Sequence, residues 1–388
     1  MDRRAAQRFA GDEETIFATM SALAVRTGSL NLVQGFPDAD GPESVREAAV
    51  AALRGGRNQY APGRGVPELR QAVARHQRRY GLDLDPDTQV VVTAGATEGI
   101  AGAILGLVDP GDEVVVLEPS YDSYLACLRI AGARVRLVTL RWPYLRVDLD
   151  DLRAAVTDRT RLLLINSPHN PTGMVLTAEE RRVIAEVAQR HDVLVVTDEV
   201  YEHLTFDGRA HVPLASEEGM FDRTVTLSSA GKTFSFTGWK VGWATGPADL
   251  VDAVLAAKQW LTYTNASALQ PAVAHGLDHE LAWVDSLAQS LRRRRDYLVA
   301  GLKDLGLPTH RPDGGYFAVS DVGELGWEDG LAFCRALPDR AGVVAIPAQV
   351  FYRPGSVEGR HLVRWAFCKD DAVLTQALDR LSRADLRA

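Results

Sequence analysis

Short runs of β-branched and aliphatic residues alternate with stretches of helical periodicity between residues 89 and 260. Continuous apolar runs of this length are typical of strands buried on both faces, and a helix after each run provides the crossover of a parallel sheet. The pattern therefore predicts an α/β domain in which helices cover a mainly parallel, seven-stranded sheet. The predicted strands are residues 89–93, 113–117, 135–140, 161–166, 193–197, 224–227 and 241–244, and the predicted helices are residues 98–107, 123–131, 152–155, 178–189 and 248–260.

The pattern changes after about residue 270, where a long amphipathic helix and more widely separated strands replace the regular alternation. A single hydrophobic core stops growing at roughly 250–300 residues, so a chain of 388 residues is expected to form two domains. We predict a large domain over residues 45–275 and a smaller α+β domain over residues 1–44 and 276–388. The elements expected in the last part of the chain are helices at 281–305, 330–336 and 371–383 and strands at 316–320, 343–346 and 362–367.

Charge and hydropathy exclude several classes of protein. The formal net charge of −8 argues against general binding to nucleic acid or to an anionic membrane. Residues 1–11 are charged and lack the apolar core of a secretion signal, and no run approaches the ~18 uncharged residues of a membrane span. We therefore expect a cytoplasmic protein. The basic run Arg292–Arg295 lies within the long predicted helix and is interpreted as an exposed helix face.

The cysteines give no indication of a disulfide framework or a metal site. Cys127, Cys334 and Cys368 are odd in number and widely spaced, without a CxxC pair or a nearby histidine cluster. Reduced thiols in a cytoplasm are the simplest interpretation, and no metal is expected.

The segment from Ser228 to Lys240 reads SSAGKTFSFTGWK and holds two of the five lysines in the chain, Lys232 and Lys240. Arginine supplies most of the positive charge elsewhere, so a lysine among small, polar and glycine residues indicates that a primary amine is required. An amine condenses with an aldehyde to give a Schiff base, which a guanidinium does not. We interpret Lys232 as the covalent anchor of a cofactor, with Ser229 and Lys240 as phosphate ligands. The alternative is a lysine in a flexible loop.

A small-residue turn, TAGATEGI, spans residues 93–100 between the first predicted strand and its helix. Unpaired backbone N–H groups at the start of a helix attract a phosphate. Together with Ser229 and Lys240, this turn forms the third part of an anion site. The glycines at 63 and 65 are not a dinucleotide fingerprint, because no strand precedes them and no third glycine follows in place.

Two further turns carry residues suited to a planar cofactor. Tyr121 follows the second predicted strand in the motif PSYD, where its ring either covers the core or offers a flat stacking surface. Asn170 lies in the turn NSPHNPTG after the fourth strand, and its amide can donate to a phenolic oxygen. The neighbouring His169 is interpreted as structural, because no carboxylate or histidine stands beside it at ligand spacing.

Two charged residues are predicted to be buried. Asp198 ends the run VLVVT, and a buried carboxylate is costly unless it meets a cation. A protonated pyridine nitrogen is one such partner, with Tyr201 bonded to the phenolic oxygen of the same ring; a helix N-cap is the alternative. Arg364 stands in the apolar run HLVRWAF and needs either the carboxylate of a ligand or a structural salt bridge.

Taken in order, these motifs resemble those of the class I (fold type I) aminotransferases, which use pyridoxal 5′-phosphate. The resemblance spans nearly the whole chain and rests on TIFATMSALA, NLVQGFPD, NQYAPGRG, SPHNPTG, DEVYEHL, SSAGKTFSFTGWKVGW, IPAQVFY and HLVRWAFCKDD. It is strongest for the subgroup of kynurenine, glutamine and methionine aminotransferases and cysteine-conjugate β-lyases. Within that subgroup the chain looks nearest to the actinobacterial N-succinyldiaminopimelate aminotransferases.

The resemblance implies a role for each motif residue. Lys232 would bind the cofactor aldehyde and move a proton, and Arg364 would hold the α-carboxylate of the substrate. Tyr60 would reach the phosphate from the neighbouring subunit, so a homodimer with shared active sites is implied. The implied catalytic residues are Lys232, Asp198 and Tyr201; the cofactor-binding residues are Tyr60, Ala96, Thr97, Tyr121, Asn170, Asp198, Tyr201, Ser229, Lys232 and Lys240; the substrate-binding residues are Gly35, Phe36, Asn170 and Arg364.

The activity implied is transfer of an amino group from an α-amino acid to a 2-oxo acid, with 2-oxoglutarate as the expected acceptor and a ping-pong mechanism. Candidate donors are N-succinyldiaminopimelate, methionine, glutamine and aromatic or kynurenine-like amino acids. A β-lyase, or a cyclising or oxidising enzyme of specialised metabolism, would use the same anchor residues and stays open. A ligand-sensing regulator would need a basic DNA-binding module, for which the residues before Asn31 are too few, and a nicotinamide-dependent dehydrogenase would need the missing glycine fingerprint.

Overall fold

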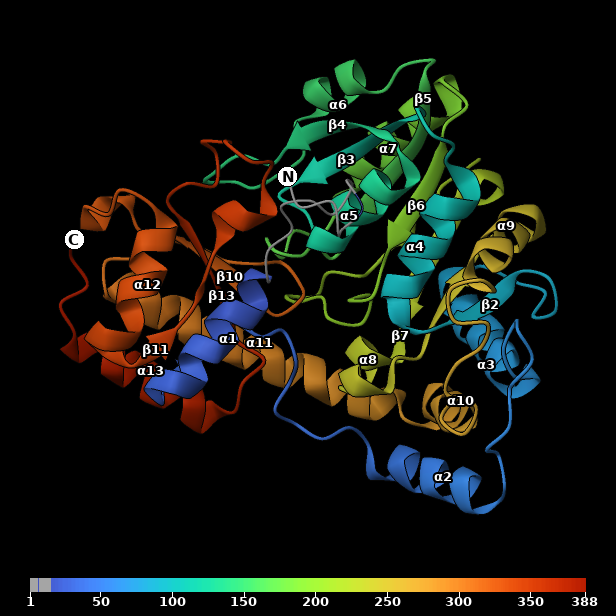
Figure 1. Ribbon diagram of the computed structural model, residues 1–388, viewed down its shortest axis with the longest axis horizontal. Helices are drawn as coiled ribbons and strands as arrows, with labels where there is room; N and C mark the ends of the chain where they lie inside the picture. Colours follow the sequence, from blue (N-terminus) through green and yellow to red (C-terminus); the bar gives the residue numbers. More distant parts are fainter. Residues whose placement is uncertain (1–5, 7–14) are drawn as a thin grey trace.

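The computed structural model describes residue 6 and residues 15–388. At its centre is a seven-stranded sheet in the order β2-β8-β7-β6-β5-β3-β4 (Figure 1). Neighbouring strands run parallel except at β8, which is antiparallel to both β2 and β7. The strands are β2 (Val90–Thr93), β3 (Glu113–Glu118), β4 (Arg134–Thr139), β5 (Thr160–Asn166), β6 (Leu194–Asp198), β7 (Thr224–Ser229) and β8 (Gly242–Thr245). All seven predicted strands are confirmed to within two residues at either end.

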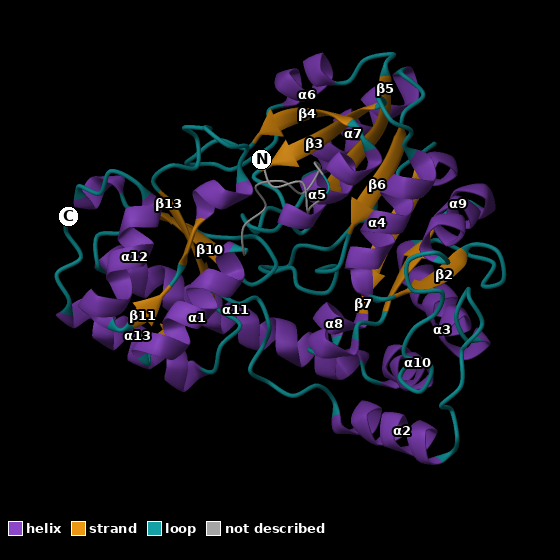
Figure 2. Cartoon of the chain, in the orientation of Figure 1, coloured by secondary structure: helices purple, strands orange, loops and turns teal. Residues whose placement is uncertain are grey.

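Helices cover both faces of this sheet, as Figure 2 shows in purple around the orange strands. Alternate side chains of a strand point to opposite faces. In β3, accordingly, Val114 and Val116 pack into one core and Val115 and Leu117 into another. The first core includes α4 (Gly95–Leu107), α5 (Asp122–Ala131) and α9 (Ala248–Lys258); the second includes α6 (Leu149–Ala155) and α7 (Ala178–Arg190); a third lies against β2 and β8 and includes α2 (Glu43–Arg54), α3 (Pro67–Gln77) and α10 (Gln270–His279).

The remaining part of the molecule is built from the two ends of the chain. A four-stranded antiparallel sheet has the order β12-β13-β10-β9, and a short parallel pair joins β1 to β11. One core unites residues 20–33 with residues 287–386, so α1 lies beside helices from the opposite end of the sequence (Figure 1). The elements are α1 (Ile16–Thr27), β1 (Leu30–Asn31), α11 (Leu281–Asp304), β9 (Thr309–His310), β10 (Phe317–Asp321), α12 (Gly330–Ala341), β11 (Val343–Val344), β12 (Ile346–Pro347), β13 (Leu362–Ala366) and α13 (Asp371–Arg383).

The α/β fold with a second, smaller antiparallel sheet is as expected. The domain boundaries at residues 44/45 and 275/276 stay a prediction. The strand expected at 343–346 is divided in two, because Val343–Val344 pairs with β1 while Ile346–Pro347 pairs with β13. The helix expected to end at residue 336 continues to Ala341, past Pro338.

The interpretation of the basic run in α11 as an exposed face is wrong for Arg295. Arg292 and Arg293 are exposed, but Arg295 is fully buried and donates to both carboxylate oxygens of Asp207 at 2.9 Å. The reason is helical spacing: Arg295 lies on the same side of α11 as the buried Leu291 and Leu298. Arg295 is therefore a core residue whose charge is balanced by the carboxylate of Asp207.

Two sequence expectations concern the start of the chain and membrane insertion. The charged segment at residues 1–11 lies outside the described residues, apart from residue 6. Among the described helices, none combines the length and the apolar character needed to cross a bilayer. Cys127, Cys334 and Cys368 are all buried and unbridged.

Candidate active site

A cavity of about 230 Å³ opens at the carboxyl ends of β5, β6 and β7. This edge is where open α/β sheets bind ligands. The volume is several times the roughly 30 Å³ that one water molecule takes up in the liquid, so the cavity can hold a small organic molecule. All predicted cofactor residues except Tyr60 line it, namely Ala96, Thr97, Tyr121, Asn170, Asp198, Tyr201, Ser229, Lys232 and Lys240.

Lys232 lies in the short helix α8 (Ala230–Thr233), directly after β7. Its Nζ atom donates to the hydroxyl of Tyr316 at 2.8 Å and to the carbonyl of Gly35 at 3.2 Å. Part of the side chain faces the cavity, yet the amine is deep enough that burial lowers its pKa to about 8. Asp198 opposes this shift and Lys240 adds to it. A substantial fraction of the amine is therefore neutral near physiological pH, as a nucleophile or base requires.

One end of the cavity is suited to a phosphate. Gly95 begins α4 with a φ of +71°, and a Cβ atom at this position would lie 3.1 Å from Nζ of Lys240. No side chain caps this helix start, so the N–H groups of the first turn, around Ala96 and Thr97, are available to an anion. Asn265 donates to the carbonyl oxygen of Lys240 at 2.8 Å and holds that backbone in place.

The same cavity is lined by the buried carboxylate of Asp198. Its Oδ2 atom accepts from the hydroxyl of Tyr124 at 2.7 Å, and Oδ1 accepts from the backbone N–H of Val200 at 3.3 Å. Burial raises the pKa of Asp198, and the Tyr124 hydrogen bond counteracts that shift. No helix begins at Asp198, so the N-cap alternative is wrong. A cationic ring nitrogen in the cavity would relieve the cost of burying this charge.

Tyr121 and Tyr201 provide aromatic surface beside this carboxylate. Tyr121 is half-buried at the start of α5, with its ring edge-on to that of Tyr124 at 5.6 Å between centroids. It lines the cavity and also packs against the core that contains α4 and α5, so both interpretations of Tyr121 stay open. Tyr201 is buried and packs edge-on against Tyr316 at 5.1 Å. His169 is structural, as expected, with its Nδ1 atom 2.8 Å from the hydroxyl of Thr172.

Arg364 lies in β13 and is fully buried. Its Nη1 atom donates to Oδ1 of Asn170 at 3.0 Å and its Nη2 atom to the carbonyl of Val33 at 2.9 Å, while Nε has no hydrogen-bond partner in the part of the chain that the structure describes. Over residues 15–388, no carboxylate lies within 4.0 Å of the guanidinium, so the structural salt-bridge alternative is not found. The guanidinium carbon instead lies 3.9 Å from the ring centre of Phe317.

The other predicted substrate residues lie near this arginine. The carbonyl of Gly35 accepts hydrogen bonds from Lys232 and Tyr316. The ring of Phe36 is 45% exposed and lies 4.2 Å from Nζ of Lys369. Backbone carbonyls of segment 33–36 therefore accept hydrogen bonds from both basic residues of the site, from Lys232 at Gly35 and from Arg364 at Val33.

Tyr60 stands apart from the cavity of its own chain. Its side chain is 84% exposed, and its ring lies edge-on to that of Tyr263, with centroids 5.6 Å apart. The role implied by the resemblance would need a second subunit.

Two tyrosines of the site were missed by sequence reasoning. Tyr124 bonds the predicted acid Asp198, and Tyr316 bonds the predicted anchor Lys232. Buried tyrosines generally need a partner for the hydroxyl, and Tyr124 lies one helical turn after Tyr121 in a motif already singled out. That signal could have identified Tyr124, whereas nothing near Tyr316 in the sequence points to Lys232.

A lysine, a buried aspartate and a helix start without a side-chain cap, all around one cavity, are the groups that a pyridoxal-phosphate enzyme of the aminotransferase type needs. The chain belongs to this family: the family model "Aminotransferase class I and II" matches residues 27–381. It is 52% identical to a relative from Mycobacterium tuberculosis (strain ATCC 25618 / H37Rv) named probable N-succinyldiaminopimelate aminotransferase, over 95% of both chains. It is 38% identical to the methionine aminotransferase of Escherichia coli (strain K12), again over 95% of both.

A solved structure agrees with these relatives. The structure of the N-succinyldiaminopimelate aminotransferase from Mycobacterium tuberculosis matches with a TM-score of 0.95 at 52% identity, over 97% of this chain and 99% of the other. The protein is therefore an aminotransferase, and its cofactor is pyridoxal 5′-phosphate, the cofactor of the family. The residues present fit that group, since Gly95 leaves room beside Lys240 and the buried Asp198 faces the cavity without a cationic partner within 4.0 Å among the described residues.

Proposed function

We propose that the protein moves an amino group from an α-amino acid to 2-oxoglutarate by a ping-pong mechanism. The observation that carries this proposal is the buried guanidinium of Arg364, which has an orphan Nε atom and no carboxylate partner within 4.0 Å in the described part of the chain. A planar guanidinium binds a carboxylate with two parallel hydrogen bonds. Both substrates of a transaminase share an α-carboxylate, so one arginine serves both half-reactions.

The residues of the site have distinct proposed roles. Lys232 anchors the cofactor and then, as a neutral amine, takes the proton from the substrate Cα and returns it. Asp198 holds a proton on the ring nitrogen, and Asn170 and Tyr201 hold the phenolic oxygen. Ala96, Thr97, Ser229 and Lys240 bind the phosphate, and Tyr121 stacks on the ring. When bound, the cofactor supplies an electron sink for the electrons left at Cα.

Arg364 is proposed to bind the α-carboxylate together with Asn170 and the backbone of Gly35, with Phe36 beside the substrate side chain. Asn170 supports this assignment because its Oδ1 atom already accepts from Arg364, which leaves the amide N–H groups as donors for a ligand. Fixing the carboxylate aims the Cα–H bond at the amine of Lys232.

For the donor, we propose N-succinyldiaminopimelate first, on the strength of the relative with 52% identity. Methionine, glutamine and aromatic or kynurenine-like amino acids are further candidates, supported by relatives with methionine and kynurenine activities in their names. β-Elimination, cyclisation or oxidation on the same residues is the alternative chemistry. A panel of these donors with 2-oxoglutarate tests the proposal. Stoichiometric pyridoxamine phosphate after one half-reaction supports transamination, whereas pyruvate and ammonia from a β-substituted substrate indicate a lyase.

We also propose that the active form is a cytoplasmic homodimer. The support is the exposed pair Tyr60 and Tyr263 beside Trp260, whose side chain is 84% exposed. Large aromatic side chains that are exposed together are typical of interface surfaces. Size measurement in solution tests the dimer directly.

A further inference from the structure

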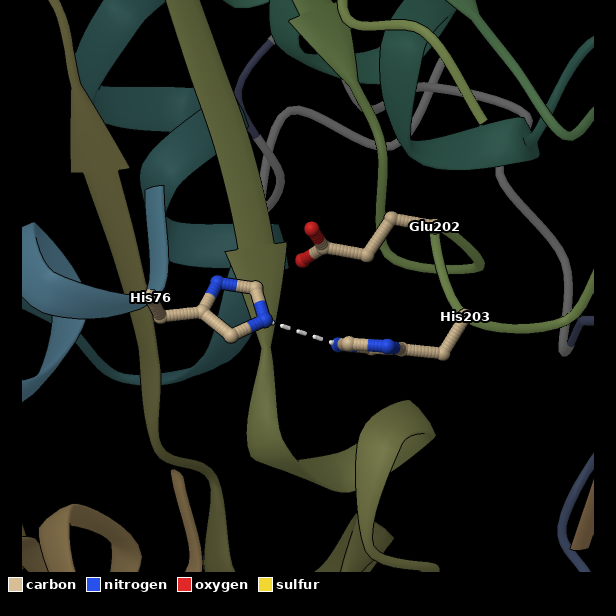
Figure 3. A group of neighbouring side chains, drawn as sticks. All are labelled: His76, Glu202 and His203. Carbon is tan, nitrogen blue, oxygen red and sulfur yellow. Dashed lines mark hydrogen bonds between the residues drawn. The ribbon is translucent and has the colours of Figure 1, made fainter. Parts of the chain in front are cut away.

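A second group of chemically active side chains lies away from the cavity, between α3 and the turn that follows β6. His76 is the penultimate residue of α3, and Glu202 and His203 follow Tyr201 in sequence. Their potential ligand atoms all lie within 4.8 Å of one another. Figure 3 shows the Glu202 carboxylate and the two rings converging on one point, with the Nε2 atoms of His76 and His203 3.1 Å apart.

The hydrogen bonds around the two rings determine where their protons lie. Arg79 is a donor only, and its Nη1 atom lies 3.2 Å from Nδ1 of His203. That nitrogen must therefore accept, so the ring is neutral, carries its proton on Nε2 and donates to Nε2 of His76. His76 is then neutral as well, with its proton on Nδ1, a buried atom without a hydrogen-bond partner among the described residues. Neutral imidazole is the form that binds a metal ion.

Glu202 brings a negative charge to the same place. Its residue is 3% exposed, and Oε1 accepts from the hydroxyl of Ser228 at 2.6 Å. No salt bridge to a lysine, arginine or histidine reaches this carboxylate within 4.0 Å in residues 15–388. A buried carboxylate beside two neutral imidazoles, without a cation in direct contact, is costly and would be stabilised by one.

We propose that His76, Glu202 and His203 form a binding site for one divalent transition-metal ion of the zinc type. Two imidazoles and a carboxylate are a ligand set that zinc accepts, with a water molecule in the fourth position. Ligand atoms of a tetrahedral zinc ion lie about 3.3 Å apart, given bonds of about 2.0–2.1 Å. The imidazole pair already has this spacing. The carboxylate approaches by side-chain rotation, and the exposed Arg79 moves into solvent. With Arg79 gone, Nδ1 of His203 can carry the ring proton, so that Nε2 loses its proton and is free to bind the ion.

Such an ion would tie α3 to the segment that carries Tyr201, which lines the active-site cavity. Ser228, which bonds Glu202, directly precedes Ser229 at the phosphate end. The proposed metal site is thus separate from the active-site cavity but is linked to two segments that line it, those of Tyr201 and Ser229.

The test uses the cofactor-loaded protein, stripped of metals with a chelator and titrated with Zn²⁺. We expect about one Zn²⁺ per chain by elemental analysis and a higher Tm with Zn²⁺ than without it, because an ion that binds only the folded state stabilises it. Co²⁺ in the same site should give visible ligand-field bands. His203→Gln and Glu202→Gln should each weaken Zn²⁺ binding at least about tenfold, and Arg79→Ala should strengthen it, because it removes a competing positive charge.

Two controls separate this site from other histidines and from misfolding. The exposed His279 and the half-buried His275 form a pair in α10 with ring centroids 4.7 Å apart, so His279→Gln should leave both Zn²⁺ stoichiometry and affinity unchanged. The Tm of each metal-stripped variant shows whether it folds. A wild-type chain that takes up less than about 0.2 equivalents, Zn²⁺ binding lost in His279→Gln, or weaker binding in Arg79→Ala would each overturn the proposal.

Discussion

The guanidinium of Arg364 and the amide of Asn170 are joined by a 3.0 Å hydrogen bond between Nη1 and Oδ1, although 194 positions separate them in the chain. The bond links β13 to the turn that follows β5. It connects the proposed substrate carboxylate site on the smaller sheet with the proposed cofactor site on the larger one. The geometry of the reaction thus depends on how the two sheets pack.

Replacement of Arg364 by lysine should selectively impair substrate binding. Lysine keeps the charge but loses the two-pronged geometry, and hydrogen bonds to charged groups contribute about 1.5–3 kcal/mol. We expect kcat/KM for the amino acid to fall about 10- to 150-fold, mainly through KM, with cofactor absorbance unchanged. Steady-state kinetics measure this, and Arg182→Lys, on the exposed face of α7, is the matched control. Equal kinetic losses in both variants would contradict the assignment.

Removal of the Tyr124 hydroxyl should destabilise the Asp198 carboxylate. In Tyr124→Phe the carboxylate keeps only the Val200 N–H among its described donors, so the pKa of Asp198 should rise further. The free energy of unfolding should fall by about 1–3 kcal/mol, the cost of an under-satisfied buried acceptor. Urea unfolding and cofactor titration measure the two effects. Tyr144→Phe, at a residue that is 75% exposed, should change neither.

The amine of Lys232 should titrate well below an ordinary lysine. Burial lowers its pKa to about 8 in the absence of cofactor, against about 10.4 for an unperturbed lysine. The neutral, reactive fraction therefore rises as pH increases through about 8. In the apoenzyme, labelling with an amine-reactive reagent, followed by peptide mass spectrometry, should reach half its maximal rate near that pH. Lys303, exposed in α11, is the comparison lysine in the same sample, and coincident profiles for both lysines would rule the shift out.

The Arg295–Asp207 pair should stabilise the fold, unlike its neighbours in the basic run. Asp207→Ala leaves a buried guanidinium with fewer partners and should lower the free energy of unfolding by about 1–3 kcal/mol. Arg292→Ala, on the exposed side of the same helix, should stay within about 0.5 kcal/mol of wild type. Chemical denaturation provides both numbers, and similar losses in the two variants would refute the distinction.

The Arg295–Asp207 pair should also affect the stability of the protein in acid. Hydrogen bonds from Arg295 and Arg311 lower the pKa of Asp207 below its usual value. A carboxyl group whose pKa is lower in the folded state stabilises that state at pH values above its unfolded-state pKa, which is about 3.9 for aspartate. This stabilisation is lost as the pH falls towards the lowered pKa. The difference between wild type and Asp207→Ala in unfolding free energy should therefore shrink below about pH 4.

The proposed sharing of Tyr60 between subunits can be tested by mixing two defective variants. Lys232→Ala lacks the anchor and Tyr60→Ala lacks the exposed tyrosine. A hybrid dimer of the two would hold one site with both residues and one with neither, so it should recover about half the wild-type activity per dimer. Differently tagged, co-expressed chains allow the hybrid to be isolated. A hybrid no more active than the mean of its parents would argue against a shared site.

Much of the fold could be predicted because buried parallel strands leave a local signal. Runs such as residues 161–166 place apolar side chains on both faces of the sheet. A strand that is covered by helices on both faces needs this composition, whichever helices cover it. The residues at the strand ends could be predicted for the same reason, since all parallel strands present their carboxyl ends to one edge. Asp198 and Ser229 therefore meet around one cavity without any long-range information being needed.

The sequence by itself determined the order of strands and helices, the position of the predicted anchor lysine and the family to which the chain belongs. The tertiary structure alone decided that Arg295 is buried, that residues 343–347 divide between two sheets, and that Tyr316 reaches Lys232 from 84 positions away. It also brought His76 against His203 across 127 positions. The physical reason is that the periodicity and burial of one strand or helix are set by residues that are close together in the sequence. A hydrogen bond between distant side chains depends instead on how completed elements pack.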